Sequence, residues 1–219
     1  MKLLTIQLNN VSKRYRNKIV FNNLNLSINN KKVNFLVSPN GVGKSTLIKI
    51  MLDLIVYKGN ITTNCQSFAY CPEKVLLPNY IKVFDFISLF NINIEEAIVL
   101  LKKFNVDLTL KINNLSKGMH QKIILVQCLT SNVDAYFFDE PLNGLDEVSE
   151  NIFLEEINKL FLKNKLIVIS SHYLERYSTL PSNVIKLWIV KIIKNKLCVF
   201  FVQKKRTFSF DLHVNNFIY

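Results

Sequence analysis

Apolar and polar residues alternate near the start of the chain and give way to mostly apolar runs further on. Residues 3–8 and 24–28 alternate in this way, which is typical of strands that bury one face. Polar residues separate them, so we expect a small antiparallel β subdomain in this region. The runs at 33–37, 133–138 and 166–169 are mostly apolar, as expected for strands buried on both faces of a parallel sheet.

Helical patterns lie between these buried strands. Residues 47–55, 121–130 and 150–162 are predicted to be helices. Residues 58–60 have the composition of a turn, and residues 61–70 return as strand-like sequence. Because strands that alternate with helices favour a parallel sheet, the chain is expected to be an α/β protein with a mostly parallel sheet wrapped by helices.

A small helical subdomain is expected to be inserted in this core. Residues 81–110 are mainly helical in pattern, and four apolar residues are spaced for one helix face: Ile94, Ile98, Leu101 and Phe104. We assign about residues 75–115 to this subdomain and about residues 184–219 to a strand-rich C-terminal tail. Both belong to a single predicted domain, residues 1–219.

A glycine-containing segment follows the apolar run 33–37 and precedes a helix. Consecutive backbone N–H groups in a tight loop, backed by a helix N-terminus, supply convergent donors for a polyphosphate. The predicted phosphate-binding residues are Ser38, Pro39, Asn40, Gly41, Val42, Gly43, Lys44, Ser45 and Thr46. This pattern predicts the core of a P-loop NTPase, although the consensus has glycine where this chain has Ser38.

The residue types in this loop suit specific roles in binding a nucleotide. Gly41 and Gly43 let the backbone approach the phosphates, and Lys44 reaches the β and γ phosphates with its ammonium group. The hydroxyl of Ser45 is a ligand for Mg²⁺. Thr46 opens the helix with its own N–H directed toward the phosphates.

Two acidic residues follow the apolar run that ends at residue 138. Asp139 and Glu140 are therefore expected at the carboxyl end of a buried strand, the edge where α/β sheets bind ligands. We expect Asp139 to hold Mg²⁺, directly or through water. Glu140 is expected to polarise the water that attacks the γ-phosphate.

The net charge and the cysteines narrow the partners and the compartment that we expect. The chain has 219 residues and a formal net charge of +12, but its basic residues are scattered, with tight groups only at 13–16 and 204–206. Nucleic acid is therefore not an expected partner. The four cysteines lack zinc-site spacing and are expected to be reduced thiols of a cytosolic protein. Secretion is not expected, and the longest apolar stretches fall short of the ~18 residues of a membrane span.

Four further pieces, taken in chain order, resemble the ATP-binding cassette (ABC) family of ATPases. They are Leu115-Ser116-Lys117-Gly118-Met119, Asp139-Glu140, Gly144-Leu145-Asp146 and Ser170-Ser171-His172. The resemblance spans about residues 3–190. The family's signature peptide normally reads Leu-Ser-Gly-Gly-Gln, so Lys117 and Met119 depart from it. This variant, with Glu73 where the family has a glutamine, resembles the branch that exports antibiotics and peptides.

The resemblance implies ATP as the nucleotide and a role for each matching residue. Tyr15 stacks on the adenine, and Glu73 couples the site to a partner. Ser116 and Gly118 of one subunit cover the ATP held by the other subunit, and Asp146 carries information between the two sites. His172 contacts the γ-phosphate and Glu140, so the predicted catalytic residues are Glu140 and His172.

The resemblance also implies partners and a location. The chain is expected to form a homodimer, or a heterodimer with a related ATPase, and to bind a separate transmembrane permease. It would then be a cytoplasmic protein on the inner face of the cell membrane that powers export of a peptide, antibiotic or lipid-like substrate.

Two alternatives stay open. The net charge motivates a soluble ABC ATPase that acts on ribosomes or DNA, against which stand the single cassette and the lack of sustained heptads. The altered loop and signature also admit a cassette that binds nucleotide without hydrolysing it.

Overall fold

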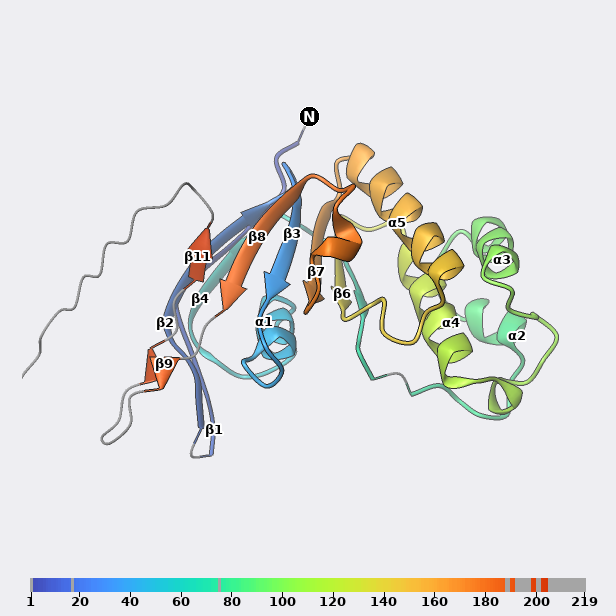
Figure 1. Cartoon of the computed structure of the whole chain (residues 1–219), viewed down its shortest axis with the longest axis horizontal. Coiled ribbons are helices and arrows are strands. Elements are labelled where there is room, and N and C mark those ends of the chain that lie inside the picture. The colour runs from blue at the N-terminus through green and yellow to red at the C-terminus, as the bar shows by residue number, and fades with distance from the viewer. Residues whose placement is uncertain are drawn as a thin grey trace, which may run out of the picture.

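The computed structural model describes residues 2–16, 18–74, 76–187, 190–191, 198–199 and 202–204. Its N-terminal part is a three-stranded antiparallel sheet in the order β2-β1-β4, built from β1 (Thr5–Tyr15), β2 (Lys18–Asn29) and β4 (Lys58–Thr63). β1 and β2 form a long hairpin that is visible at the lower left of the molecule (Figure 1). The antiparallel β subdomain expected from the alternating pattern is therefore present.

The central sheet has six strands in the order β11-β8-β3-β7-β6-β5. All neighbours are parallel except β11 and β8. The strands are β3 (Val33–Val37), β5 (Phe68–Cys71), β6 (Ala135–Asp139), β7 (Leu166–Ser171), β8 (Ser182–Leu187) and β11 (Val202–Lys204). A short pair, β9 (Val190–Lys191) and β10 (Cys198–Val199), completes the strands of the described residues.

Helices cover both faces of this sheet (Figure 1). They are α1 (Lys44–Met51), α2 (Val83–Ile87), α3 (Ile94–Lys103), α4 (Lys117–Leu129) and α5 (Glu147–Leu162), with 3-10 turns η1 (Ile112–Asn114) and η2 (Glu175–Tyr177). The expected α/β fold, with a mostly parallel sheet wrapped by helices, is confirmed. None of the helices in the described residues combines the length and the apolar character that a membrane crossing requires.

The mostly apolar strands are buried on both faces because the sheet separates two cores. Successive residues of a strand point to opposite faces. Phe138 accordingly packs in the core beneath α4 and α5, whereas Phe137 packs in the core with α1 and the N-terminal sheet. Ile167 and Val168 of β7 divide in the same way. The two cores fix the sheet so that the carboxyl ends of β3, β6 and β7 meet at one edge.

The segment between α1 and β5 differs from its prediction. The helix expected to reach residue 55 ends at Met51, and Asp53 adopts a left-handed φ of 55° that a helix cannot contain. Residues 61–70 are not one strand, because β4 pairs with β1 whereas β5 pairs with β6 in the other sheet. Gly59 lies inside β4 rather than in a turn.

Gly59 is a packing requirement of the N-terminal sheet. It has φ of 101°, and a Cβ atom there would lie 2.4 Å from the carbonyl oxygen of Asn10 on β1. Only glycine allows this approach between the two backbones. Glycine, which suggested a turn in the sequence, is therefore needed here because β4 and β1 lie close together.

The helical stretch contains α2 and α3, which pack with α4. Asn93 caps α3 by accepting a hydrogen bond from the N–H of Glu96 at 3.1 Å. Of the predicted apolar face, Leu101 and Phe104 are buried, and Ile94 and Ile98 pack partly buried against them. The boundaries 75–115 stay a prediction. Most of the predicted tail, residues 184–219, lies outside the described residues.

Candidate active site

Residues 38–46 connect β3 to α1 at the carboxyl edge of the sheet. Gly43 has φ of 123°, and a Cβ atom there would lie 2.7 Å from Cγ1 of Val20, so the loop is pressed against the β1–β2 hairpin. Gly41 has φ of 76° and nothing within 4 Å of the Cβ position, so its backbone can be approached from outside. Ser38 is buried with a negative φ, which explains why a residue with a side chain fits where the consensus has glycine.

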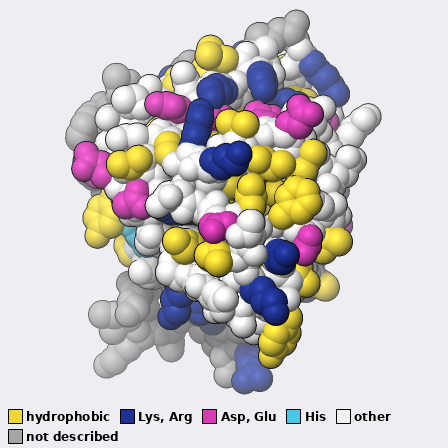
Figure 2. Space-filling view, turned by 90° about the vertical axis from the view of Figure 1, so that its right-hand side faces the viewer, with side chains coloured by type: hydrophobic (Ala, Val, Ile, Leu, Met, Phe, Trp, Pro, Cys, Tyr) yellow, Lys and Arg dark blue, Asp and Glu magenta, His cyan; other side chains and the backbone are white. Residues whose placement is uncertain are grey.

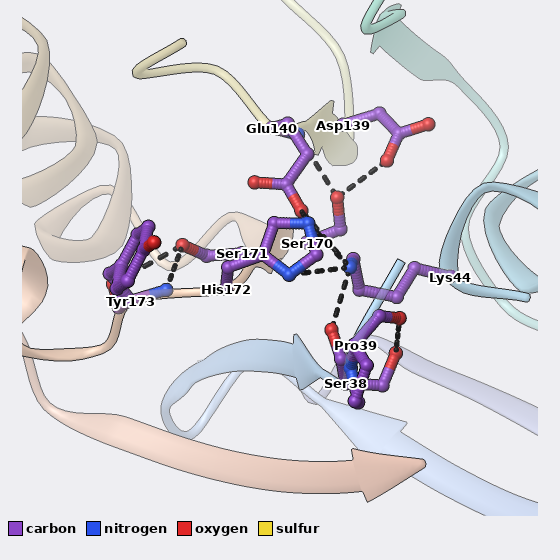
Figure 3. A network of polar contacts seen from close by, with 9 residues as sticks. All are labelled: Ser38, Pro39, Lys44, Asp139, Glu140, Ser170, Ser171, His172 and Tyr173. Atoms are coloured by element: carbon purple, nitrogen blue, oxygen red, sulfur yellow. Dashed lines mark hydrogen bonds and ion pairs between the residues drawn. The ribbon is translucent and has the colours of Figure 1, made fainter. Parts of the chain in front are cut away.

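Lys44, in the first turn of α1, is the centre of a polar cluster (Figure 3). Its Nζ donates to the carbonyl oxygen of Ser38 at 2.8 Å and lies 3.1 Å from Oε1 of Glu140. The two ring nitrogens of His172 lie 3.4 and 3.2 Å from the same Nζ. Lys44 is only 6% exposed, so its ammonium group is held in place by these contacts.

Glu140 and His172 also contact each other. Nε2 of His172 lies 3.0 Å from Oε1 of Glu140, the oxygen that faces Lys44. That oxygen is buried and its contacts are ion pairs rather than hydrogen bonds of regular geometry. Both ring nitrogens of His172 therefore lie beside the Lys44–Glu140 pair. The ends of β3, β6 and β7 thus bring together residues distant in sequence.

Asp139 and Glu140 end β6 beside the last residues of β7. Asp139 is buried, and its Oδ1 accepts a hydrogen bond from the hydroxyl of Ser170 (Figure 3). The backbone N–H of Glu140 donates to the same hydroxyl oxygen at 3.0 Å. Glu140 has φ of 51°, a left-handed value that is unusual for a residue with a side chain. The chain therefore turns sharply between the two acids.

A cleft of about 220 Å³ runs from the β1–β2 hairpin to the polar cluster. Tyr15, at the hairpin end, is 46% exposed, and Nζ of Lys13 lies 4.5 Å from its ring centroid. Glu73, in the loop after β5, is exposed and lines the opposite part. The predicted residues that line the cleft are Tyr15, Pro39, Asn40, Gly41, Gly43, Lys44, Ser45, Thr46, Glu73 and Glu140. Val42 is buried beneath the loop.

Ser116 and Gly118 are not brought to this cleft. They lie at the N-terminus of α4, which is well apart from α1 in Figure 1. Ser116 caps α4, its hydroxyl accepting from the N–H of Met119 at 3.3 Å. A Cβ atom on Gly118 would lie 3.0 Å from the carbonyl oxygen of Gly144, so the helix start packs closely on the loop after β6.

Asp146 joins that loop to α4 and α5. Its Oδ1 caps α5 by accepting from the N–H of Ser149 at 2.8 Å, and its Oδ2 pairs with Nζ of Lys122 at 2.9 Å. The hydrogen bond from Lys122, followed by that from Ser149, holds the pKa of Asp146 well below its usual range. Asp146 thus fixes how the loop meets the start of α5.

The sequence prediction missed residues that support the site. Nζ of Lys18 donates to the carbonyl oxygen of Gly41 at 3.0 Å and so ties the β2 side of the hairpin to the phosphate loop. Lys122 holds Asp146, and Ser170 bridges the two acids. Ser170 stood inside a quoted motif, but no sequence pattern distinguishes Lys18 or Lys122 from the other lysines of a lysine-rich chain.

Ser45, which lines the cleft, and the buried Asp139 at the end of β6 carry oxygen atoms that suit Mg²⁺ carried by a polyphosphate. Ser45 offers a hydroxyl and Asp139 a carboxylate, both oxygen ligands of the kind this ion prefers. Within the described residues there is no group of three side chains that could hold a metal alone. Mg²⁺ usually takes one or two protein ligands and completes its shell with water and substrate phosphates.

Comparisons with known proteins give the family. The model of the ABC transporter family matches residues 21–143. The zinc import ATP-binding protein ZnuC of Rickettsia conorii is 33% identical over 177 residues, which cover 76% of this chain and 76% of that protein. The manganese transport system ATP-binding protein MntB of Bacillus subtilis is 27% identical over 197 residues, covering 79% of each chain. A solved ATP binding subunit of an ABC transporter has a TM-score of 0.74 at 24% identity, covering 83% of this chain and 85% of that one.

The chain therefore belongs to the ABC transporter family, as an ATP-binding domain. This confirms the expected ATPase class and the P-loop fold. The names of the two relatives refer to metal ions rather than to peptides or antibiotics. Membership of the export branch therefore stays a prediction.

The cap at Asp146 gives a prediction for stability. Asp146→Ala should lower the free energy of unfolding at pH 7 by ~1 kcal/mol, because it removes the N-cap of α5. Asp146→Asn is the matched control, since it keeps an acceptor for the N–H of Ser149 and loses only the charge. Urea unfolding of the parent and both variants measures these differences.

The pH dependence of the same difference has a definite sign. Because the folded-state pKa of Asp146 is lowered, the charge contributes stability above the ordinary pKa of about 3.9 and loses it as the pH falls through the lowered value. The advantage of the parent over Asp146→Asn should therefore shrink below about pH 4. An advantage that grows on acidification would contradict this account.

Proposed function

We propose that the chain binds MgATP in the cleft, hydrolyses it with Glu140 and His172, and thereby powers a membrane transporter. The observation that carries this proposal is the cluster of Lys44, Glu140 and His172 at the end of the phosphate loop. A cation that binds phosphate and a residue that positions or deprotonates the water are recurring parts of phosphoryl transfer, and here His172 contacts both Lys44 and Glu140.

Binding would begin with an exchange of partners at Lys44. The ammonium group is paired with Glu140, so phosphate oxygens compete with that carboxylate for it. The N–H groups at the start of α1 add donors, and the helix dipole favours the negative charge. Stacking of the adenine on Tyr15, which already stands 46% exposed at the cleft, would contribute ~1–3 kcal/mol by analogy with base–aromatic contacts.

Hydrolysis would then use the groups that the exchange releases. Glu140, freed from Lys44, accepts the proton of the attacking water as general base. His172 stays beside the same carboxylate oxygen, and a ring N–H of this residue would donate toward the γ-phosphate. Mg²⁺ held by Ser45 and Asp139 would neutralise charge that develops on the phosphates.

Ser116 and Gly118 need a second copy of the chain to serve this site. They cap and begin α4, far from the cleft of their own subunit (Figure 1). In a dimer, a homodimer or a pair with a related ATPase, the N-terminus of α4 would face the γ-phosphate bound by the partner. Asp146, tied to α4 through Lys122, is placed to link that helix with the loop after the catalytic acids.

A surface near α2 is proposed to bind the permease. Glu73 lines the cleft, and the segment that follows it leads to α2. Three apolar side chains of this segment and of α2 are exposed: Leu76 at 98%, Tyr80 at 80% and Phe84 at 44%. Figure 2 shows hydrophobic side chains gathered on the side of the molecule that carries α2 and α3. Because one segment joins the cleft to this surface, a cytoplasmic helix of the permease docked here would respond to nucleotide. The chain would then lie on the inner face of the membrane.

The direction of transport has two candidates. Glu73 and the Lys117–Met119 form of the signature favour export of a peptide, antibiotic or lipid-like substrate. The names of the relatives favour transport of a divalent metal, zinc import among them. In vesicles with the chain and ATP on one side, an exporter moves its substrate to the far side and an importer moves it toward the ATP.

Two substitutions test the chemistry. Lys44→Ala should abolish productive ATP binding, because it removes the ammonium group that pairs with Glu140 beside the phosphate loop and would bind the phosphates in its place. Glu140→Gln should still bind ATP and should slow hydrolysis by roughly 10²–10⁴, as expected for a lost general base. Phosphate release and nucleotide binding are measured with the permease present.

The control is Lys49→Ala, which removes an exposed lysine from the same helix. It should match the parent in both measurements. Hydrolysis by Glu140→Gln at the parent rate would show that Glu140 is not the base. A parent chain that retains no nucleotide would refute the proposed function as a whole.

Tyr80→Asp tests the docking surface. A charge at this exposed position should abolish co-purification with the permease from detergent extract while the ATPase rate of the isolated chain stays at the parent value. Leu162→Asp, at the end of α5 and 69% exposed, introduces the same charge elsewhere and should not change co-purification. Equal recovery of the permease with Tyr80→Asp would place the docking site on another face.

A further inference from the structure

Ser170 occupies a buried position between the two acids of the site. It is the penultimate residue of β7, is fully buried, and lies opposite Asp139 in the parallel register of β6 and β7. Figure 3 shows its hydroxyl between Asp139 and Glu140. A buried hydroxyl needs hydrogen-bond partners, but here both partners belong to the proposed catalytic groups.

The hydroxyl gives the site a fixed direction of hydrogen bonding. The N–H of Glu140 donates to Oγ of Ser170, and the single proton of that hydroxyl is directed to Oδ1 of Asp139. Oδ1 is thereby engaged, which leaves Oδ2 of Asp139 as the oxygen available to a cation. A chain of this kind also polarises each member, so Asp139 is held in one orientation.

The same contacts hold an unfavourable backbone conformation. A left-handed φ such as the 51° of Glu140 costs ~1–3 kcal/mol for a residue with a side chain. Its N–H has two acceptors on Ser170, the hydroxyl at 3.0 Å and the carbonyl oxygen at 3.2 Å. The turn held in this way directs the carboxylate of Glu140 to Lys44 and His172 instead of along the strand (Figure 3).

We propose that Ser170 is a positioning residue that orients Asp139 toward the cation and Glu140 toward the attacking water at the same time. Its hydroxyl contacts the two acids, and it acts through them. The proposal rests on the proposed function, because it assigns Ser170 a role in that same site.

The test compares Ser170→Ala with the conservative Ser170→Thr. Loss of a group that orients a metal-binding carboxylate typically costs 10–100-fold in metal affinity or activity. Ser170→Ala should therefore lower kcat by about 10–100-fold and raise the Mg²⁺ concentration needed for half-maximal nucleotide binding by about 10-fold or more. Ser170→Thr, which keeps the hydroxyl, should restore both values to near those of the parent.

A third readout does not depend on nucleotide. Hydrogen exchange of the peptide that contains Glu140 should be faster in Ser170→Ala than in the parent, because the N–H loses one of its two acceptors. Ser131→Ala is the matched control: it removes a hydroxyl that donates to Gln127 at the far end of α4 and should change none of the three readouts.

The outcomes separate the possible roles. A folded Ser170→Ala protein with the parent's Mg²⁺ requirement and the parent's exchange rate would overturn the proposal, even if its unfolding temperature falls. A folded Ser170→Thr protein that behaves like Ser170→Ala would overturn it as well. If the parent itself fails to hydrolyse ATP, the proposed function fails, and the exchange experiment still decides whether Ser170 holds the turn at Glu140.

Discussion

The ion pair between Lys44 and Glu140 is the interaction on which the site depends. Both groups are buried, and a buried charge is costly unless a partner compensates it. His172 and the carbonyl oxygen of Ser38 complete the set, so three segments of the chain meet around one ammonium group. A phosphate group can take the place of the carboxylate because it is also an anion with oxygen acceptors. Within the protein, Glu140 therefore occupies the position beside Lys44 that a triphosphate would take.

This meeting point follows from the topology of the sheet. Parallel strands end at a common edge, and the order of β3, β7 and β6 places the phosphate loop, His172 and the two acids side by side. The strands are held there by cores on both faces, so the edge is rigid. The N-terminal hairpin adds Tyr15 and Lys18 from a separate sheet. Residues far apart in the chain are therefore brought together by the sheet.

Much of this arrangement could be predicted from local pattern. Apolar runs predicted β3, β6 and β7, and the residue types at 38–46 and 139–140 predicted a phosphate loop and two acids, which the structure places at one edge of the sheet. What the sequence could not show were contacts that arise only from tertiary packing, such as Lys18 on the carbonyl of Gly41 or Ser170 between the acids. Gly59 was misread for the same reason: its positive φ serves a contact with Asn10, not a turn. Ser116 and Gly118 lie away from the cleft, at the start of α4, and their proposed role needs a second copy of the chain.

The competition for Lys44 can be measured directly. The affinity of the parent and of Glu140→Gln for a non-hydrolysable ATP analogue with Mg²⁺, determined by calorimetry at equal salt, compares the site with and without its internal anion. The account predicts tighter binding by Glu140→Gln, because the neutral amide no longer competes with the phosphates for the ammonium group. Equal or weaker binding by this variant would contradict the claim that phosphate takes the place of Glu140.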